Sequence, residues 1–369
     1  MTTPGKKRTA AEKPRVGLVH SPHPVFEELA AALTLQLSQT GWDCFAVRGI
    51  PATSRDLDLV LLIGDVAMLP WVDAMLANVR ARNIPTLLWQ LEPLPPRPLN
   101  DNALATVRRL YPVLRAEHIY RSNRARRLAN RFFSWQLARQ AAGAFGSAHL
   151  PADRYRLQLV SRSFQWAQDS YFAGRVTRIL AGMQAGAALL GQAGIQAKYV
   201  PVGYHPLLGT LRPHVERDLD VVFFGSVTDE RATALRDIES RLGKVGYCLT
   251  VVSDNCYGET RIRLLNRTKI VLNLLNYPWE FPSLRLVMAM ACGCMVISVS
   301  NSDPAPFRDG GHFIQTAPDS ICGTLLQHLA NEDERNVLAQ QGHAFVTGEM
   351  TMRKTIVPEI ERMLEIGPG

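Results

Sequence analysis

Apolar and polar positions along the chain follow two different periodicities. Short, almost entirely apolar runs such as 57–65 are typical of parallel strands that are covered on both faces. Between these runs, apolar residues recur at helical spacing, as in 24–41, where Gly41 ends the predicted helix. Strands that alternate with helices in this way predict a parallel sheet with helical crossovers. The predicted strands of this first unit are 15–20, 43–48, 57–65, 85–92, 176–183 and 197–203.

The alternation restarts after residues 204–218, a stretch with prolines and little periodicity that we interpret as a linker. The strands predicted beyond it are 219–227, 247–254, 269–275, 294–300 and 311–317. We therefore predict an α/β protein with two Rossmann-like domains that face each other across a cleft. The predicted segments are a disordered basic tail (1–14), an N-terminal domain (15–205), a C-terminal domain (206–345) and a C-terminal helix that packs back on the N-terminal domain (346–369).

Length and composition narrow the class of protein. The 369 residues exceed one ordinary hydrophobic core, and 47% apolar with 20% charged residues is typical of a folded, soluble protein. No stretch reaches the roughly 18 uninterrupted apolar residues of a membrane span, and no secretory signal follows the basic N-terminus. The six cysteines are scattered without the paired spacing of a zinc site, so we expect reduced thiols and a cytoplasmic location.

Positive charge is concentrated in one segment. The formal net charge of +8 favours an anionic partner. Between residues 108 and 139 the sequence has nine arginines and one acid, Glu117, interleaved with leucine and aromatic residues. A basic amphipathic helix of this kind is typical of proteins that lie on an anionic membrane, here the inner membrane surface. Arginines and aromatics also bind nucleic acid, and a solvated helical face is the third interpretation.

One stretch, "NLLNYPWEFPSLRLVMAMACGCMVIS" (273–298), combines a strand, a glutamate and a predicted helix. Pro282 suits the first helical position. The backbone N–H groups and positive dipole end of a helix N-terminus suit a diphosphate, and Glu280 beside them can accept hydrogen bonds from sugar hydroxyls. Glu280 could instead cap the helix. Arg285, one turn into the helix, offers bidentate contacts to phosphate or is a surface arginine.

Together with "KYVPVGYHP" at the predicted joint and "DVVFFGSVTDER" at the start of the second domain, this stretch resembles the nucleotide-sugar-binding domain of GT-B glycosyltransferases. The similarity covers about residues 176–345 and is greatest to the large, mostly retaining group 1 family and its spore-maturation-protein-like branch. The resemblance implies the GT-B fold and transfer of a sugar from a nucleotide-diphosphate donor, a UDP- or GDP-sugar, without a bound cofactor or metal. It favours retention of configuration. It leaves the acceptor open among a glycan, a lipid-linked molecule and a nucleic acid.

The resemblance also implies roles for individual positions. The glutamate that matches Glu280 contacts the donor sugar, and Arg231 is our candidate for neutralising the departing diphosphate. Met288 is a departure, because it stands where the family has a second glutamate that holds the donor ribose, and methionine is only a weak hydrogen-bond acceptor. An ordinary core residue is the other interpretation of Met288. The further donor-side candidates are Gly225 and Ser226, which end a buried strand, and Phe281, Ser283, Leu284 and Arg285.

Three residues of the first domain are candidates for the catalytic or acceptor side. His20 and His23 in "HSPHP" follow the first predicted strand, and imidazole has a pKa suited to proton transfer. Glu92 ends the fourth predicted strand in "WQLEP". Each of the three could instead be an ordinary turn residue. An inverting transferase would need such a base, whereas a retaining transferase would not.

A second hypothesis is that the chain is a binding protein and not an enzyme. If the missing acid at Met288 abolishes transfer, the chain is a catalytically inactive GT-B-like protein. It would then bind an anionic polymer, either nucleic acid or a membrane surface, through the arginine-rich face of the N-terminal domain.

Overall fold

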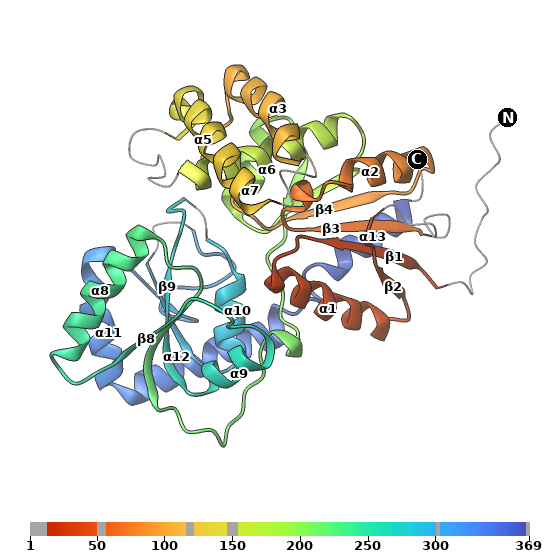
Figure 1. The fold of residues 1–369 in the computed structure, drawn as a ribbon. Helices are drawn as coiled ribbons and strands as arrows, with labels where there is room; N and C mark the ends of the chain where they lie inside the picture. The colour runs from red at the N-terminus through yellow and green to blue at the C-terminus, as the bar shows by residue number, and fades with distance from the viewer. Residues whose placement is uncertain are drawn as a thin grey trace.

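The computed structural model describes residues 13–49, 57–115, 122–145, 154–279, 281–299 and 303–366. These residues form two α/β domains, each built on a parallel sheet with helices on both faces (Figure 1). Residues 1–12 of the predicted basic tail lie outside the described residues.

The N-terminal sheet has six parallel strands in the order β2-β1-β3-β4-β5-β6. The order reverses between β1 and β3, which makes this point the topological switch where ligands bind in such sheets. The strands are β1 (Arg15–His20), β2 (Asp43–Ala46), β3 (Leu59–Ile63), β4 (Thr86–Gln90), β5 (Arg178–Ala181) and β6 (Ala197–Tyr199). The helices are α1 (Pro24–Gln39), η2 (Val66–Met68), α2 (Val72–Ala81), α3 (Asp101–Arg115), α5 (Asn123–Phe145), α6 (Arg154–Phe172) and α7 (Gln184–Gln192).

The C-terminal sheet has five parallel strands in the order β11-β10-β9-β7-β8, with its switch point between β7 and β9. The strands are β7 (Leu219–Phe224), β8 (Leu249–Val252), β9 (Thr268–Leu274), β10 (Met295–Val299) and β11 (Ile314–Thr316). The helices are η3 (Pro206–Leu208), α8 (Asp229–Gly243), α9 (Gly258–Asn266), α10 (Leu284–Ala291), η4 (Pro318–Ser320), α11 (Ile321–Ala330), α12 (Glu332–Ala344), η5 (Phe345–Glu349) and α13 (Val357–Ile366).

Strand β3 shows why the buried strands are continuous apolar runs in the sequence. Its five residues are all buried. Leu59, Leu61 and Ile63 pack into the core on the α1 side of the sheet, whereas Val60 and Leu62 pack into the core under α2, α3 and α6. Successive side chains of a strand point to opposite faces, so a sheet covered on both faces needs apolar residues at every position.

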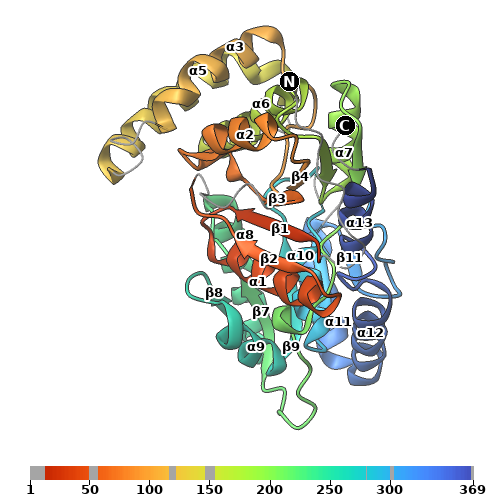
Figure 2. The same ribbon diagram turned by 90° about the vertical axis from the view of Figure 1, so that its right-hand side faces the viewer.

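Two helices differ from the sequence expectation. Helix α6 lies in a stretch for which the apolar pattern made no prediction, because its inner face carries buried polar side chains such as Gln158 (0% exposed) and Arg162 (1% exposed). Helix α10 begins at Leu284, two residues after the predicted first residue Pro282. Helices α3 and α5 lie side by side and extend from the body of the N-terminal domain as an arm (Figure 2).

The two domains are joined by a linker that crosses the C-terminal segment. The Tyr204 N–H donates to the Met350 carbonyl at 2.6 Å. A Cβ at Gly203 would lie 2.6 Å from the Met352 nitrogen, so only glycine allows this close approach. Beyond the crossing, α13 lies against the N-terminal sheet, where Glu359 pairs with Lys198 of β6 at 2.6 Å (Figure 1).

A buried ion pair joins α1 of the N-terminal domain to α9 of the C-terminal domain. Arg261 is 1% exposed, and its Nη1 lies 2.6 Å from Oε2 of Glu28. The other oxygen of Glu28 accepts a hydrogen bond from the Gly258 N–H at the start of α9. Within the described part of the chain, the Glu28–Arg261 ion pair therefore holds α1 and α9, and with them the two domains, together.

Candidate functional site

At the carboxyl end of β7, the guanidinium of Arg285 lies directly over the backbone of Gly225. The chain turns at Gly225 with φ of 128°, a conformation that favours glycine. A Cβ at Gly225 would lie 2.7 Å from Nη2 of Arg285. The predicted glycine therefore keeps space for the guanidinium at the switch point of the sheet.

Two arginines converge on the carboxyl end of β9. Arg231 comes from α8 on one face of the sheet, and Arg285 comes from α10 on the other face. Arg231 Nη2 donates to the Leu274 carbonyl, and Arg285 Nη1 lies 3.4 Å from the same oxygen. The two guanidinium carbons lie 5.4 Å and 5.3 Å from the ring centroid of Phe223. The predicted arginines thus share one acceptor and one aromatic ring.

Further hydrogen bonds hold the two guanidiniums in place. Arg231 Nη1 donates to the Ser226 carbonyl at 2.8 Å. Arg285 Nη1 donates to Oδ1 of Asn273 at 2.6 Å, and the amide of Asn273 donates to Oγ of Ser298 at 2.9 Å. Because these acceptors are fixed by the ends of β7, β9 and β10, the two cations are positioned before any ligand binds.

No carboxylate oxygen of the described residues lies within 4.0 Å of either guanidinium. Arg231 is only 5% exposed. Burial, followed by the neighbouring Arg285 and Arg156, lowers the pKa of Arg231 below its ordinary value, and burial lowers the pKa of Arg285. Two adjacent cations, one of them buried, are unfavourable unless an anion neutralises them. The arrangement therefore favours binding of an anion.

A third arginine reaches this edge from the N-terminal domain. Arg156 of α6 donates from Nη1 to the Asn276 carbonyl at 3.1 Å and pairs through Nη2 with Glu230 at 3.2 Å. Nearby, Nε1 of Trp279 donates to the Leu94 carbonyl at 2.9 Å. Sequence reasoning missed Arg156, because it lies in a helix without a recognisable motif and far along the chain from the loop it contacts.

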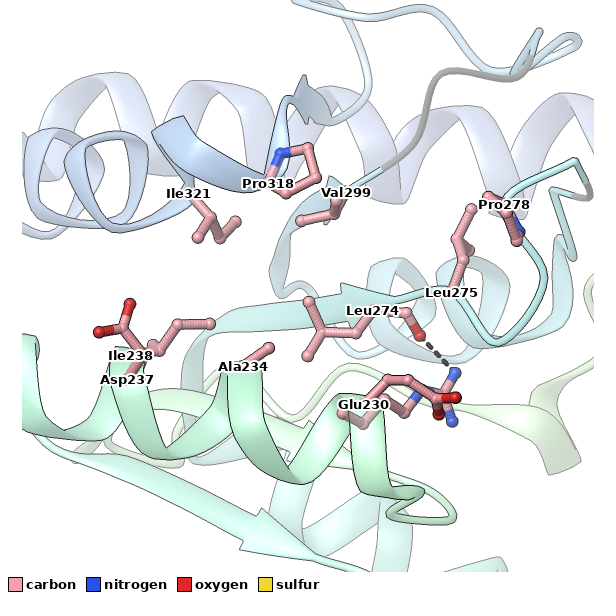
Figure 3. Close-up of a pocket in the computed structure, with 11 residues that line it drawn as sticks. Glu230, Ala234, Asp237, Ile238, Leu274, Leu275, Pro278, Val299, Pro318 and Ile321 are labelled. Carbon is pink, nitrogen blue, oxygen red and sulfur yellow. Dashed lines mark hydrogen bonds between the residues drawn. The ribbon is translucent and has the colours of Figure 1, made fainter. Parts of the chain in front are cut away.

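A cavity of about 250 Å³ adjoins Arg231 on the α8 and α11 side of the sheet (Figure 3). Its wall is mainly apolar, with Glu230 and Asp237 among the lining residues. An apolar wall does not stabilise phosphate charge, so the polar edge between Arg231 and Arg285 remains the candidate anion site. The apolar lining includes Ala234, Ile238, Leu274, Leu275, Val299 and Ile321.

The other predicted donor-side residues lie around the start of α10. Glu280 lies outside the described residues, so its contact with the sugar stays a prediction. Phe281 is 7% exposed and packs against Phe313, with ring centroids 5.6 Å apart. Ser283 is 2% exposed, and its hydroxyl accepts from the Val202 N–H at 3.0 Å. Leu284 is half-buried against the shared core. The side chains of Phe281 and Ser283 are therefore engaged in packing and in holding the linker.

Met288 lies in the core. It is 2% exposed and belongs to the cluster of buried residues shared by α1, α10 and the C-terminal segment. Position 288 therefore faces away from solvent in this structure, which agrees with the interpretation of Met288 as an ordinary core residue.

The two predicted histidines differ in their hydrogen bonds. His20 lies at the end of β1, and its Nδ1 is 2.9 Å from the Ser21 carbonyl. A carbonyl only accepts, so Nδ1 of His20 carries the proton and the lone pair is on Nε2. His23 caps α1 instead: its Nδ1 accepts from the Val25 N–H at 3.3 Å, so the neutral ring carries its proton on Nε2. Only His20 presents a free basic nitrogen.

Glu92 follows β4 next to a buried ion pair. Asp65 (6% exposed) follows β3 and pairs with Arg162 of α6 (1% exposed). Burial, and then the charge of Asp65, raise the pKa of Glu92 to about 7, although Arg162 opposes this rise. Glu92 can therefore exchange a proton near neutral pH. Sequence reasoning missed Asp65 and Arg162, although Asp65 ends a buried strand just as Glu92 does.

In the described ranges, no group of three or more His, Cys, Asp or Glu side chains has an arrangement that could hold a metal ion. None of the helices there combines the length and the apolar character that crossing a bilayer requires.

Residues 213–359 match the family model described as glycosyl transferase-like. This match contains the whole C-terminal sheet together with Arg231 and Arg285. By this match, the C-terminal domain is similar to glycosyl transferase-like proteins. The resemblance seen in "EFPSLRLVMAMACG" is thereby confirmed. A search of curated protein sequences found no match.

Several solved structures are similar to this protein over nearly the whole chain. HepE from Anabaena, solved with UDP-glucose, has a TM-score of 0.54 at 12% identity, over 95% of this chain and 99% of that chain. AviGT4, a glycosyltransferase involved in avilamycin A biosynthesis, has a TM-score of 0.50 at 13% identity, over 96% and 99%. Sucrose-phosphate synthase from Thermosynechococcus elongatus has a TM-score of 0.50 at 11% identity, over 96% and 99%. The predicted GT-B fold is confirmed.

Proposed function

We propose that this protein transfers a sugar from a nucleoside-diphosphate sugar to a hydroxyl group of an acceptor. One observation carries the proposal: the buried Arg231 and the half-buried Arg285 meet at the carboxyl end of β9 without a carboxylate partner among the described residues. A diphosphate supplies the missing negative charge and accepts several hydrogen bonds from the two planar guanidiniums.

The same pair suits the chemical step. When the bond between the sugar anomeric carbon and the diphosphate oxygen breaks, negative charge develops on the leaving oxygen. Fixed guanidiniums in a water-poor site stabilise that charge without having to reorganise. Glu280 stays our candidate for contacting the sugar, and Gly225 and Ser226 form the loop beside the phosphates.

We place the acceptor at the facing edge of the N-terminal sheet. Nε2 of His20 and the Glu92 carboxyl can each accept a hydrogen bond from the attacking hydroxyl. We propose retention of configuration, which only the resemblance supports. In a retaining transfer, His20 and Glu92 orient the hydroxyl; in an inverting transfer, one of them takes its proton. Proton NMR of the anomeric signal of the product distinguishes the two outcomes.

UDP-glucose is the first donor to test, because HepE was solved with it. Calorimetric titration with UDP-glucose, a GDP-sugar and an ADP-sugar should show saturable binding of at least one. The turnover assay is release of the nucleoside diphosphate, with water as acceptor if no other is found. Glu280→Ala should abolish turnover and leave the melting temperature unchanged, while the exposed control Glu216→Ala should keep full activity.

Two results would contradict this proposal. One is near-normal turnover in Glu280→Ala, which would remove the sugar-contacting role. The other is the absence of binding for all nucleotides together with salt-sensitive binding of nucleic acid. That second result would favour the inactive GT-B-like polymer-binding protein instead.

A further inference from the structure

Helix α5, in the arm formed with α3, has two different apolar faces. Its inner face packs on the domain, with Phe133 (1% exposed) and Leu137 (0% exposed) fully buried. Its outer face carries Leu128 (60% exposed), Phe132 (53% exposed) and Trp135 (47% exposed). These three residues are spaced i, i+4 and i+7, so they form one stripe on the side that faces away from the core.

Cations border this stripe. At 100° per residue, Arg124, Arg131 and Arg139 fall within about 60° of Leu128 on the helix circumference, and all three are exposed. The guanidinium of Arg139 lies 5.2 Å from the ring centroid of Trp135. In the described part of the chain, Arg124 and Arg131 have no carboxylate oxygen within 4.0 Å.

Other arginines of the arm serve a different purpose. Arg108 of α3 pairs with Asp169 of α6 at 2.7 Å, and Arg109 donates to Gln136 of α5 at 2.8 Å. The first contact fixes the arm to the domain, and the second joins its two helices. These two arginines therefore hold the arm in place, whereas Arg124, Arg131 and Arg139 border the exposed apolar stripe.

We propose that the outer face of α5, made of Arg124, Leu128, Arg131, Phe132, Trp135 and Arg139, docks on an anionic phospholipid bilayer. A helix that lies in the membrane interface inserts its apolar side chains between headgroups, with a tryptophan at the interface and arginines that reach the phosphates. The arm extends from the body (Figure 2), so a flat surface can reach α5 without meeting the rest of the N-terminal domain first.

A bilayer fits this face better than a nucleic acid does. Nucleic-acid surfaces use arginines for phosphate and aromatic rings for stacking on bases. Leu128 is aliphatic and 60% exposed, and neither phosphate nor a base face stabilises it there. Acyl chains remove it from water. The proposal does not depend on the donor site, because none of these residues contributes to it.

The test is flotation of the full chain with vesicles of phosphatidylcholine containing 30% phosphatidylglycerol, compared with phosphatidylcholine alone. The protein should bind the anionic vesicles and lose most binding at high salt. The triple change Arg124→Gln, Arg131→Gln and Arg139→Gln should lower the partition coefficient about 100-fold, at roughly fivefold per arginine near an anionic surface. The double change Phe132→Ser and Trp135→Ser should lower it at least about tenfold.

Matched controls use exposed residues elsewhere. Val337→Ser (52% exposed) and Val245→Ser (56% exposed) control for the apolar changes, and Arg236→Gln, Arg263→Gln and Arg353→Gln control for the charge changes. All should bind vesicles as the unchanged protein does. Quenching of tryptophan fluorescence by a spin-labelled lipid should disappear in Trp135→Phe, which shows insertion at this residue directly.

Three outcomes would overturn the proposal. They are no binding to anionic vesicles, binding that survives both sets of outer-face changes, and binding lost only with the arginines while Phe132→Ser with Trp135→Ser has no effect. Salt-sensitive binding of RNA or DNA in place of vesicles would assign the face to nucleic acid. Calorimetric titration with UDP-glucose should give the same result for all variants, which keeps a failure of this proposal separate from a failure of the proposed donor.

Discussion

The facing edges of the two sheets carry opposite kinds of charge. The C-terminal edge presents Arg231 and Arg285 from opposite faces of the sheet, without a carboxylate partner among the described residues. The N-terminal edge presents two carboxyl groups, Asp65 and Glu92, and the buried Arg162 is paired with Asp65. The two edges have the same topology of parallel strands, so the difference lies in side chains alone.

The two edges of the same fold therefore suit different ligands. Two adjacent cations without a carboxylate partner favour an anion, which is why we propose that this edge holds the departing diphosphate. A carboxyl group whose pKa is near 7 favours a neutral hydroxyl and can share its proton. The Glu28–Arg261 pair holds α1 against α9 and so keeps the two edges facing each other.

The largest expected effect comes from removing the cations of the C-terminal edge. Charge-assisted hydrogen bonds each contribute about 1.5–3 kcal/mol, so Arg231→Met with Arg285→Met should weaken UDP-glucose binding by roughly 1,000-fold in calorimetry. Arg231→Lys with Arg285→Lys keeps both charges and should recover part of the affinity. Arg236→Met, an exposed change on the same helix α8, is the control and should bind normally.

Unchanged affinity in the double methionine variant would mean that this edge does not hold the diphosphate. The difference in charge between the two edges would then be unrelated to donor binding. Circular dichroism of the unliganded variant checks that it is folded.

The second largest effect concerns the clamp between the domains. Glu28→Gln removes the charge that pairs with Arg261, a guanidinium only 1% exposed. A buried charge left without its partner costs about 3–5 kcal/mol, so urea unfolding should show a loss of this size. Glu27→Gln, at an exposed neighbouring position of α1, should change the free energy of unfolding by less than about 0.5 kcal/mol. Equal stability of both variants would show that the ion pair does not hold the domains together.

The sequence predicted the C-terminal edge better than the N-terminal edge, and the reason is physical. Arg231 and Arg285 lie in the first turns of helices that follow buried strands, and position along such a strand–helix unit determines which residues meet at the sheet edge. Gly225 is identified in the same way.

The N-terminal edge depends on pairs that no local pattern encodes. Asp65 meets Arg162 across 97 positions of the chain, and Arg156 meets the Asn276 carbonyl across 120. Both arginines come from α6, whose buried polar residues hide its helical periodicity. For His20 and His23, the sequence predicted the positions, whereas the hydrogen bonds of their Nδ1 atoms decide which ring has a basic nitrogen free.

Glu92 gives the N-terminal edge a dependence on pH near neutrality, which the arginines of the C-terminal edge do not share. Burial and the charge of Asp65 raise the pKa of Glu92 to about 7 from 4.5, so the folded state binds its proton more tightly than the unfolded state does. Its stabilising contribution is complete below pH 4.5 and is lost as the pH rises through about 7. Glu92→Gln should therefore leave stability unchanged at pH 4.5 and raise it by up to about 3 kcal/mol at pH 8.5.

The same variant should lower turnover by about 10- to 100-fold, because an amide oxygen is a weaker hydrogen-bond acceptor than a carboxylate and cannot take up the proton of the acceptor hydroxyl. Thermal unfolding at both pH values and the nucleoside-diphosphate release assay measure the two effects. If turnover is normal while the stability gain appears, Glu92 is a buried acid without a role in transfer. His20 would then be the remaining candidate of the N-terminal edge for contacting the acceptor hydroxyl.

The smallest expected effect is that of the conservative change Met288→Leu, which tests whether the C-terminal edge uses a side chain at this position. Met288 is 2% exposed and Met290, two residues along α10, is 0% exposed, so each can control for the other. Met288→Leu and Met290→Leu conserve volume and should each cost less than about 1.5 kcal/mol of stability. Because a core residue does not touch the donor, both should bind UDP-glucose within about twofold of the unchanged protein. A selective loss of affinity in Met288→Leu would show that position 288 faces the ribose after all.

Met288→Glu should fail to restore the family's ribose-holding acid and should destabilise the fold by several kcal/mol instead, since it places a carboxylate among the apolar residues shared by α1, α10 and the C-terminal segment.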